Sequence, residues 1–390
     1  MYNKKTILVF GGGNLQISLI NCCKSMDLFT IVIDPDSKAK GKSIADLFEV
    51  IDGQDFKKTC DIIEKYKIKA IITSATDKPL VMMAKLASKY NIPFYSEQTA
   101  LLSTDKFLMK KTFQLNDIPC PKGYLVSNVD DISDFPVIVK PRDNSGGRGV
   151  STCASLETAR ISLNYAFQNT KQPNVVIEEV IDGYEYSIEA IHFKGKTEII
   201  QFTEKTTTSL PYHVELGHIQ PANLDQNIKE KIVEIIDKIA IAFKFDNCAS
   251  HTELKVNEKG IFILETSPRL GGDYITSMLT PLSSGINIEK MLIEISLGNT
   301  PIYSREKDNF SGIFYFNLPT GTIKSVSGLK KAQKIIGVKS FELNVSVGST
   351  INEIKNSIDR IGFVVLQSKN MNNLLELKNQ FFATVKIEMY

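Results

Sequence analysis

The stretch HTELKVNEKGIFILETSPRLGGD, residues 251–273, decides the fold that we predict for this chain. Two runs of alternating residues flank the sequence NEKG, which predicts a pair of strands joined by a tight turn. Side chains repeat on one face every second residue, so His251 and Glu253 share a face of the first strand. The second strand ends near Glu265, and the turn brings Glu265 beside Glu253. Neighbouring carboxylates repel each other unless a cation lies between them, which indicates a hard divalent cation with Arg269 beside it to meet an anion.

A second interpretation of the same stretch is a solvated surface. Charged residues that flank a hairpin are most often exposed to water. The choice between a metal site and a solvent-exposed hairpin surface therefore depends on whether the rest of the chain carries motifs that would complete a metal site.

The composition is that of a globular protein of two or three domains. The chain has 390 residues, of which 43% are hydrophobic and 23% charged. Its net charge of +2 predicts no nucleic-acid partner. No apolar run approaches the roughly 20 residues that span a bilayer, and the apolar run TILVF is only as long as a strand, so we expect neither membrane contact nor a signal peptide. The six cysteines have no CxxC or zinc spacing, which predicts reduced thiols in a cytoplasmic protein.

Residues 1–98 alternate between strand-like and helix-like segments, which predicts a parallel sheet covered by helices. Glycines follow the first strand and Asp34 ends the second, as in dinucleotide-binding domains. The sequence GGGNLQ lacks the third glycine of the GxGxxG fingerprint, however. We therefore expect a Rossmann-like domain with a tight strand-to-helix turn rather than an NAD site.

Two lysines and a glycine-rich loop indicate a phosphate-binding site. Lys106 lies in the first turn of a predicted helix, where the helix dipole disfavours a cation, and such local conflicts often mark function. Lys140 ends a predicted strand and precedes the loop 143–151, whose glycines can expose backbone N–H groups to phosphate. The loop lacks the Walker pattern. An ordinary surface lysine and a glycine-rich hairpin turn are the alternatives.

Acidic residues follow on two predicted strands. Glu178 and Glu179 end the first strand and Glu185 begins the second, an arrangement that suits an adenine amino group and ribose hydroxyls. A hairpin with exposed acids is the alternative. The next segment, residues 200–222, is rich in threonine and proline and predicts a polar substrate loop between strands.

The rest of the chain predicts further regular elements. We expect an amphipathic helix over residues 224–243 and one helix over 276–297 that ends at a glycine. From residue 301 the pattern changes to alternating strands with a final helix over 371–382. This predicts a small α+β C-terminal domain, in which we identify no catalytic residue.

The order of these motifs resembles the ATP-grasp superfamily of carboxylate ligases over about residues 1–390. EKTTTSLPYHVELGHIQPA, HTE and SPRLGGD look most like the L-amino-acid ligase branch, with carbamoyl-phosphate synthase and biotin carboxylase as more distant relatives. The resemblance implies an α/β and α+β fold. It comprises a Rossmann-like domain (1–98), a two-part ATP-grasp domain (99–300, with a lid subdomain at about 115–180) and an α+β C-terminal domain (301–390).

The resemblance also implies roles for single residues. The nucleotide-binding set comprises two phosphate-binding lysines, the lid over residues 145–150, an adenine-contacting hinge and a ribose-binding acid: Lys106, Lys140, Ser145, Gly146, Gly147, Glu178, Glu179, Val180 and Glu185. The metal set comprises two carboxylates and one provisional ligand: Glu253, Glu265 and Ser267. Arg269 is the catalytic residue that steadies the acyl-phosphate or the tetrahedral intermediate. The substrate set comprises Glu215, His218, His251, Gly271 and Gly272.

The implied activity is that of an ATP-dependent, ADP-forming carboxylate–amine ligase that makes an amide bond through an acyl-phosphate. The cofactors would be ATP and two Mg²⁺ ions, with Mn²⁺ able to substitute, and the partners small-molecule carboxylate and amine substrates. A neutral histidine would accept the proton of the amine, and the family often forms homodimers. Alternatives are an ATP-grasp enzyme with another nucleophile or small acid, of the formate, bicarbonate or phosphoribosylamine type, and a catalytically weakened ATP-binding protein. The only sign of the last is Ser267, which stands where the family has asparagine.

Overall fold

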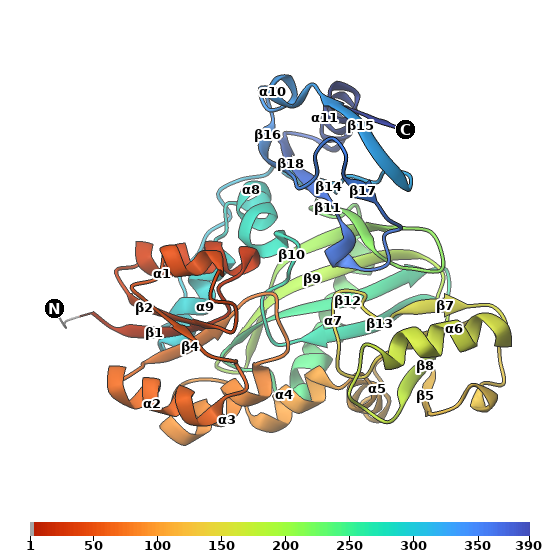
Figure 1. Cartoon of the computed structure of the whole chain (residues 1–390). Coiled ribbons are helices and arrows are strands. Elements are labelled where there is room, and N and C mark those ends of the chain that lie inside the picture. The colour runs from red at the N-terminus through yellow and green to blue at the C-terminus, as the bar shows by residue number, and fades with distance from the viewer. Residues whose placement is uncertain (1–3) are drawn as a thin grey trace.

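A parallel sheet of strand order β3-β2-β1-β4 forms the N-terminal domain, drawn in red and orange in Figure 1. The structure is a computed structural model that describes residues 4–390, so residues 1–3 of the predicted domain lie outside it. The first strand, TILVF, is buried along nearly its whole length, as expected of a parallel strand covered on both faces. The elements are β1 (Thr6–Phe10), α1 (Ile17–Ser25), β2 (Phe29–Asp34), β3 (Leu47–Val50), α2 (Phe56–Tyr66), β4 (Ala70–Thr73) and α3 (Leu80–Tyr90).

The predicted Rossmann-like alternation is confirmed. Strand β3 was not predicted, because its sequence LFEV is too short to show a period. A helix before Lys106 was also missed. It is α4 (Glu97–Thr104), and α5 (Lys106–Leu115) follows it directly after Asp105.

A separate small antiparallel sheet of order β5-β8-β6-β7, covered by α6, forms the lid subdomain at the right of Figure 1. Its apolar core lies between α6 and the sheet. Lys140 ends β6 and is followed by the glycine-rich loop, as predicted. The elements are β5 (Gly123–Val126), β6 (Val137–Lys140), β7 (Ser151–Cys153), α6 (Leu156–Phe167) and β8 (Val175–Glu179).

The large sheet is antiparallel, with the order β13-β12-β9-β10-β11-β14-β18-β16. The predicted substrate loop at 200–222 is mostly strand, because its residues alternate between buried and half-buried positions beside β9. The turn 208–214 between β10 and β11 and the last two residues, 221–222, are loop. The elements are β9 (Tyr184–Phe193), β10 (Lys196–Thr207), β11 (Glu215–Gln220), α7 (Gln226–Phe243), β12 (Cys248–Asn257) and β13 (Gly260–Ser267).

The predicted single helix over residues 276–297 is wrong. A π-helical turn (Ile275–Leu279) and α8 (Thr280–Ser284) end at Gly285, and α9 (Ile288–Ser296) begins afresh with Asn287 as its cap. Gly285 adopts a positive φ of 80°, which terminates α8.

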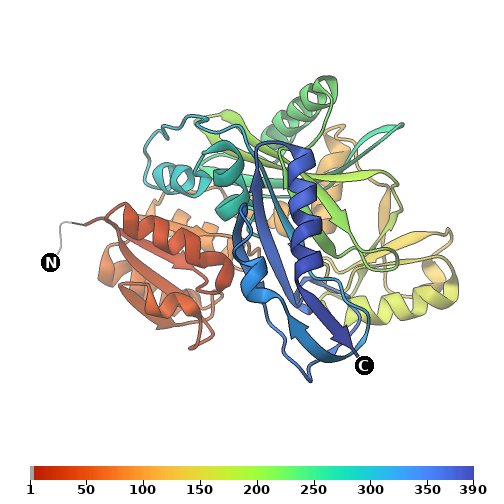
Figure 2. The same ribbon diagram turned by 90° about the horizontal axis from the view of Figure 1, so that it is seen from above.

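The C-terminal region shares the large sheet rather than standing apart. β14 (Phe310–Tyr315) pairs with β11, and β18 (Gly362–Ser368) and β16 (Val338–Leu343) continue the sheet. Figure 2 shows this region, in blue, lying over the junction between the N-terminal domain and the rest of the chain. The remaining elements are β15 (Gly321–Ser327), α10 (Leu329–Ala332), β17 (Thr350–Ile351), α11 (Met371–Thr384) and β19 (Lys386–Met389).

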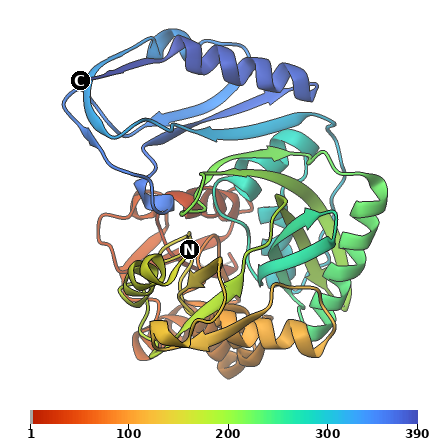
Figure 3. The same cartoon turned by 90° about the vertical axis from the view of Figure 1, so that its right-hand side faces the viewer.

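Between β17 and β18 a short 3₁₀ turn, η5 (Ser357–Asp359), leaves this region and projects toward the lid subdomain (Figures 1 and 3). All six cysteines are free thiols, as predicted. Within residues 4–390, no helix combines the length and the apolar composition that crossing a membrane requires.

Candidate functional site

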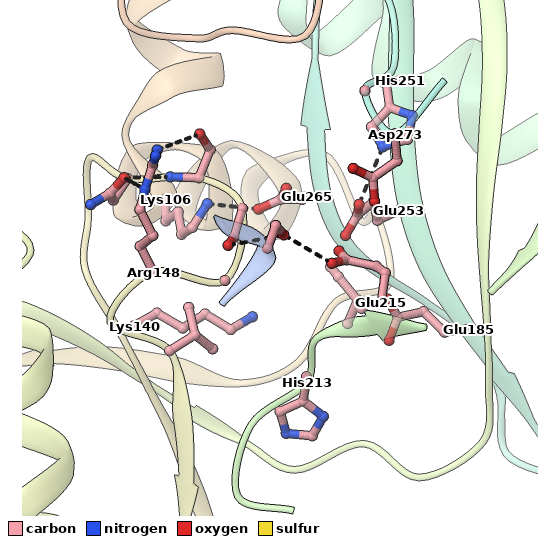
Figure 4. Close-up of a pocket in the computed structure, with 18 of the residues that line it drawn as sticks. Lys106, Lys140, Arg148, Glu185, His213, Glu215, His251, Glu253, Glu265 and Asp273 are labelled. Carbon is pink, nitrogen blue, oxygen red and sulfur yellow. Dashed lines mark hydrogen bonds and ion pairs between the residues drawn. The ribbon is translucent and has the colours of Figure 1, made fainter. Parts of the chain in front are cut away.

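A pocket of about 430 Å³ lies where the N-terminal domain, the lid subdomain, the large sheet and the η5 turn meet. It brings together most of the site residues that the sequence predicted, and Figure 4 shows several of them converging from different elements. Val180, Ser267 and Gly271 do not line the pocket. The predicted residues that do are Lys106, Lys140, Ser145, Gly146, Gly147, Glu178, Glu179, Glu185, Glu215, His218, His251, Glu253, Glu265, Arg269 and Gly272.

The predicted pair of carboxylates is in register. Glu253 on β12 lies directly opposite Glu265 on β13. The Glu265 carboxylate accepts a hydrogen bond from Lys106 Nζ at 2.6 Å, and Glu253 Oε1 lies 2.9 Å from Lys205 Nζ. Burial alone would raise the pKa of Glu253, but Lys205 and His251 outweigh it and hold the pKa well below its usual range. Glu253 is therefore an ionised ligand candidate.

Lys106 is fixed at the first position of α5. The carboxylate of Asp105 caps the helix by accepting from the N–H groups of Phe107 and Leu108. The Lys106 N–H donates to the carbonyl of Arg142 in the loop after β6, at 2.9 Å. The local conflict with the helix dipole thus has a structural reason, because the lysine is held toward Glu265.

Lys140 meets an acid that is itself buried. Glu178 is 2% exposed and lies 2.7 Å from Lys140 Nζ and 3.1 Å from Lys110 Nζ. Glu178 is predicted to contact adenine, whereas Lys110 is not among the predicted site residues. The Glu178 carboxylate holds Lys140, while Glu179 Oε1 accepts from the Lys122 N–H at 2.7 Å. The adenine contact stays a prediction.

The glycine-rich loop folds back over the pocket. Gly146, Gly147 and Gly149 have φ values of 66°, 69° and 78°, in the left-handed region that favours glycine. The Asn144 side chain accepts from the Ser145 N–H and from Arg148 Nε, each at 2.9 Å. These φ values and hydrogen bonds therefore fix the conformation of the loop.

Lys205 on β10 is a site residue that the sequence analysis did not select. Its side chain is 2% exposed and its Nζ lies 2.8 Å from Glu185, 2.9 Å from Glu253 and 3.7 Å from Glu215. These carboxylates outweigh the effect of burial and raise the pKa of Lys205 well above its usual value. Recognising β10 as a strand would have placed Lys205 on the same face as Thr203, toward the interior.

His251, a predicted substrate residue, lies between two carboxylates. Its Nδ1 lies 2.6 Å from Glu189 and its Nε2 3.2 Å from Glu253. Burial would lower the pKa of His251, but the two carboxylates outweigh it and raise the pKa to about 10. His251 is therefore an imidazolium at neutral pH. Gly271 packs behind it, where a Cβ would lie 2.8 Å from both His251 Nδ1 and Glu189 Oε2.

Arg269 is held by the N-terminal domain. Its Nε and Nη2 donate to the two carboxylate oxygens of Asp77, at 2.7 and 3.0 Å. Ser267 Oγ donates to the same carboxylate at 2.6 Å. The provisional assignment of Ser267 as a metal ligand is therefore not supported, because its hydroxyl faces Asp77 and not the pocket. The C-terminal domain, in turn, does supply a site residue, Arg360, contrary to the expectation from sequence.

Arg360 closes the far end of the pocket. It forms a two-pronged pair with Asp273, both distances being 2.6 Å, and its guanidinium stacks 3.9 Å from the centre of the Tyr315 ring. His218 Nε2 lies 3.1 Å from Asp273 Oδ2. Burial would raise the pKa of Asp273, but Arg360 and His218 lower it well below its usual range. At this end of the pocket the charges of Arg360 and Asp273 therefore neutralise each other.

The carboxylates suit a cation shared with a ligand. Within residues 4–390, no group of three or more His, Cys, Asp or Glu gathers to hold a metal without help. Glu253 and Glu265 supply oxygen ligands from adjacent strands, and Mg²⁺ is commonly bound by one or two carboxylates together with phosphate oxygens and water. The donor set therefore fits Mg²⁺ that arrives with a nucleotide.

Comparison with known proteins agrees with this geometry. Residues 133–277 match the ATP-grasp domain, and residues 314–390 match the L-amino acid ligase C-terminal domain 2. An L-arginine-specific L-amino acid ligase of Bacillus subtilis is 26% identical over 330 residues, which cover 80% of this chain and 79% of the relative. An alanine–anticapsin ligase of Bacillus amyloliquefaciens is 25% identical over 57% of this chain and 53% of the relative. The crystal structure of an L-amino acid ligase from Bacillus licheniformis superimposes over the whole of both chains with a TM-score of 0.85 at 16% identity.

The fold and the pocket define an ATP-grasp enzyme, a class that uses ATP with Mg²⁺. One stretch of the chain matches the ATP-grasp domain and another the C-terminal domain of L-amino acid ligases, and a relative that it resembles is an L-amino acid ligase. This chain is an ATP-dependent ligase that forms carbon–nitrogen bonds.

Proposed function

We propose that this chain joins the carboxylate of one amino acid to the amine of a second amino acid or amino sugar. The observation that carries the proposal is the in-register pair Glu253 and Glu265, with Lys106 on one side and the Asp77-held Arg269 on the other. This is a site for phosphate transfer to a small acid.

The reaction has two steps. The substrate carboxylate attacks the γ-phosphate of ATP, which gives an acyl-phosphate and ADP. The amine then attacks the acyl carbon, and phosphate leaves. Phosphoryl transfer depends chiefly on positioning and on neutralising charge, and the residues of this pocket supply both.

Each group of residues has a distinct task in this proposal. Lys106 and Lys140 bind the phosphates as point charges, and the glycine-rich loop offers its N–H groups to them. The segment around Glu179 contacts adenine, and Glu185 accepts hydrogen bonds from the ribose. Glu253 and Glu265 would hold Mg²⁺, which would neutralise negative charge on the phosphate oxygens. We propose two ions, with Mn²⁺ as a substitute.

The substrate end extends from Arg269 to Arg360. Arg269 meets the developing charge on the acyl-phosphate, and the cationic His251 adds a second positive group beside it. Glu215, Gly272 and His218 lie nearest to the second substrate. His218, which lines this end of the pocket, is the histidine that accepts the proton of the amine.

A screen tests the proposal. Purified protein is incubated with ATP, Mg²⁺ and pools of amino acids, and both phosphate and amide products are measured. We expect phosphate release that depends on a pair of amino acids and yields one amide per phosphate. Clear nucleotide binding without release in any pool would favour the catalytically weakened alternative. A homodimer remains a prediction, which the molar mass in solution tests.

A further inference from the structure

The turn that carries η5 bridges two parts of the pocket that are far apart in sequence. Residues 356–360, which we call the latch segment, reach the site from the C-terminal region as the pale blue ribbon in Figure 4. The segment is stiffened internally. The Asn356 side chain accepts from the Ile358 N–H, and Asp359 Oδ2 accepts from the Asn356 N–H at 3.1 Å.

One end of the latch segment holds the glycine-rich loop. The N–H of Ser357 donates to the carbonyl of Gly146 at 3.2 Å, and the Ser357 hydroxyl lies 3.2 Å from the same oxygen. The hydroxyl also lies 3.2 Å from Glu215 Oε2. Ser357 thus joins the loop that covers the phosphates to an acid at the substrate end.

The other end of the segment is anchored. Arg360 pairs with Asp273 through both of its terminal nitrogens and stacks on Tyr315, and its Nε donates back to the Ser357 carbonyl at 3.0 Å. Arg360 Nη1 also lies 3.4 Å from the Glu215 carbonyl. The position of Ser357 is therefore set by contacts at the substrate end and not by the loop alone.

We propose that Ser357 is a latch that holds the glycine-rich loop closed over the pocket and so keeps water from the acyl-phosphate. This inference rests on the proposed function. Water that reached the intermediate would attack the acyl carbon, the bond from that carbon to the phosphate oxygen would break, and the free carboxylate and phosphate would result. ATP would then be consumed without an amide. Ser357 is a positioning residue, which touches the loop and not the reacting atoms.

Two measurements on Ser357→Ala test the latch, with the exposed Ser346 of the same region as a matched Ser346→Ala control. The first is the rate at which trypsin cleaves after Arg148, inside the loop, without nucleotide. Loss of one hydrogen bond of average strength shifts a local opening equilibrium about fivefold, so we expect cleavage to accelerate by about that factor. The second is the ratio of phosphate released to amide formed, which we expect to rise above the wild-type ratio.

The two measurements distinguish a failure of the latch proposal from a failure of the proposed ligase function. If the wild type forms no amide in any pool, the proposed function fails and the cleavage rate still decides whether Ser357 holds the loop. If the wild type forms amide, a cleavage rate or a phosphate-to-amide ratio of Ser357→Ala equal to that of Ser346→Ala overturns the latch. Ser357→Thr, which keeps the hydroxyl, is expected to restore both values toward wild type, which a purely steric role of the side chain would not produce.

Discussion

Asp77 and Arg269 lie 192 positions apart in the chain and form a two-pronged ion pair that fixes the N-terminal domain to the active-site hairpin. The backbone supports the same junction, since the Ala75 N–H donates to the Leu270 carbonyl at 3.2 Å. Burial would raise the pKa of Asp77, but Arg269 and Ser267 outweigh it and hold the pKa at about 2. The arginine that we propose to meet the acyl-phosphate is therefore positioned by an ion pair with the N-terminal domain.

Asp77→Asn should lower kcat by about 10- to 100-fold with little change in affinity for ADP. The substitution keeps the size of the side chain but removes the charge that orients Arg269, and a small misplacement of a catalytic group has effects of this order. Steady-state kinetics and calorimetric ADP binding measure the two quantities. Asp61→Asn, on the exposed face of α2, is the control, and a kcat of Asp77→Asn equal to that of Asp61→Asn would refute the assignment.

Glu265→Gln and Glu253→Gln should each abolish turnover and weaken Mg²⁺-dependent binding of ADP. Each substitution removes one of the two carboxylates that face each other across β12 and β13. ADP binding is measured with and without Mg²⁺, with Glu258→Gln in the turn of the same hairpin as the matched control. Unchanged activity in either site variant would show that the metal assignment is wrong.

Lys110→Met should destabilise the fold by about 3 kcal/mol, because breaking a buried ion pair leaves an acid without one of its partners. Lys110 is 3% exposed and also donates to the Pro121 carbonyl at 2.6 Å, so it ties α5 to the base of the lid subdomain. Urea unfolding measures the change. The neighbouring exposed lysine provides the control, Lys111→Met, and equal midpoints for the two variants would contradict this role.

Glu289 should make the stability of the protein fall as the pH rises from about 4.5 to about 7. Burial raises the pKa of Glu289 from 4.5 to about 7, although a hydrogen bond from Ser18 at 2.6 Å opposes the shift. The folded state then binds more protons than the unfolded chain in this window, and stability falls by up to about 3 kcal/mol. Thermal unfolding at pH 5 and pH 8 measures the fall. Glu289→Gln should flatten it, and Glu258→Gln should not; an equal fall in Glu289→Gln would assign it to other groups.

The parts of the site that the sequence predicted are those with local patterns. The turn NEKG and the alternation predict the hairpin that carries Glu253 and Glu265, although a register shift between Glu253 and Leu254 is what places the two acids directly opposite each other. A strand that ends on Lys140 before glycines is equally local. The parts that it missed depend on contacts between distant segments. Asp77, Lys110 and Arg360 become site residues only through partners that lie elsewhere in the chain, and no period or spacing marks them. Lys205 could be found by alternation only if β10 were first recognised as a strand.

The charge state of His251 depends on distant contacts in the same way. The sequence shows that His251 and Glu253 share a face, but not that the buried Glu189 lies on the other side of the imidazole. The C-terminal region similarly shows strands and a final helix. Its contribution to the pocket comes from an irregular turn that bridges to Gly146 and Asp273, which no pattern predicts.

The most direct test of the central claim measures amide formation and phosphate release together in the presence of ATP, Mg²⁺ and pairs of amino acids. At least one pair should give an amide with one phosphate and one ADP per bond, and Glu265→Gln should give none. Phosphate release without any amide in every pair, or amide formation that persists in Glu265→Gln, would contradict it.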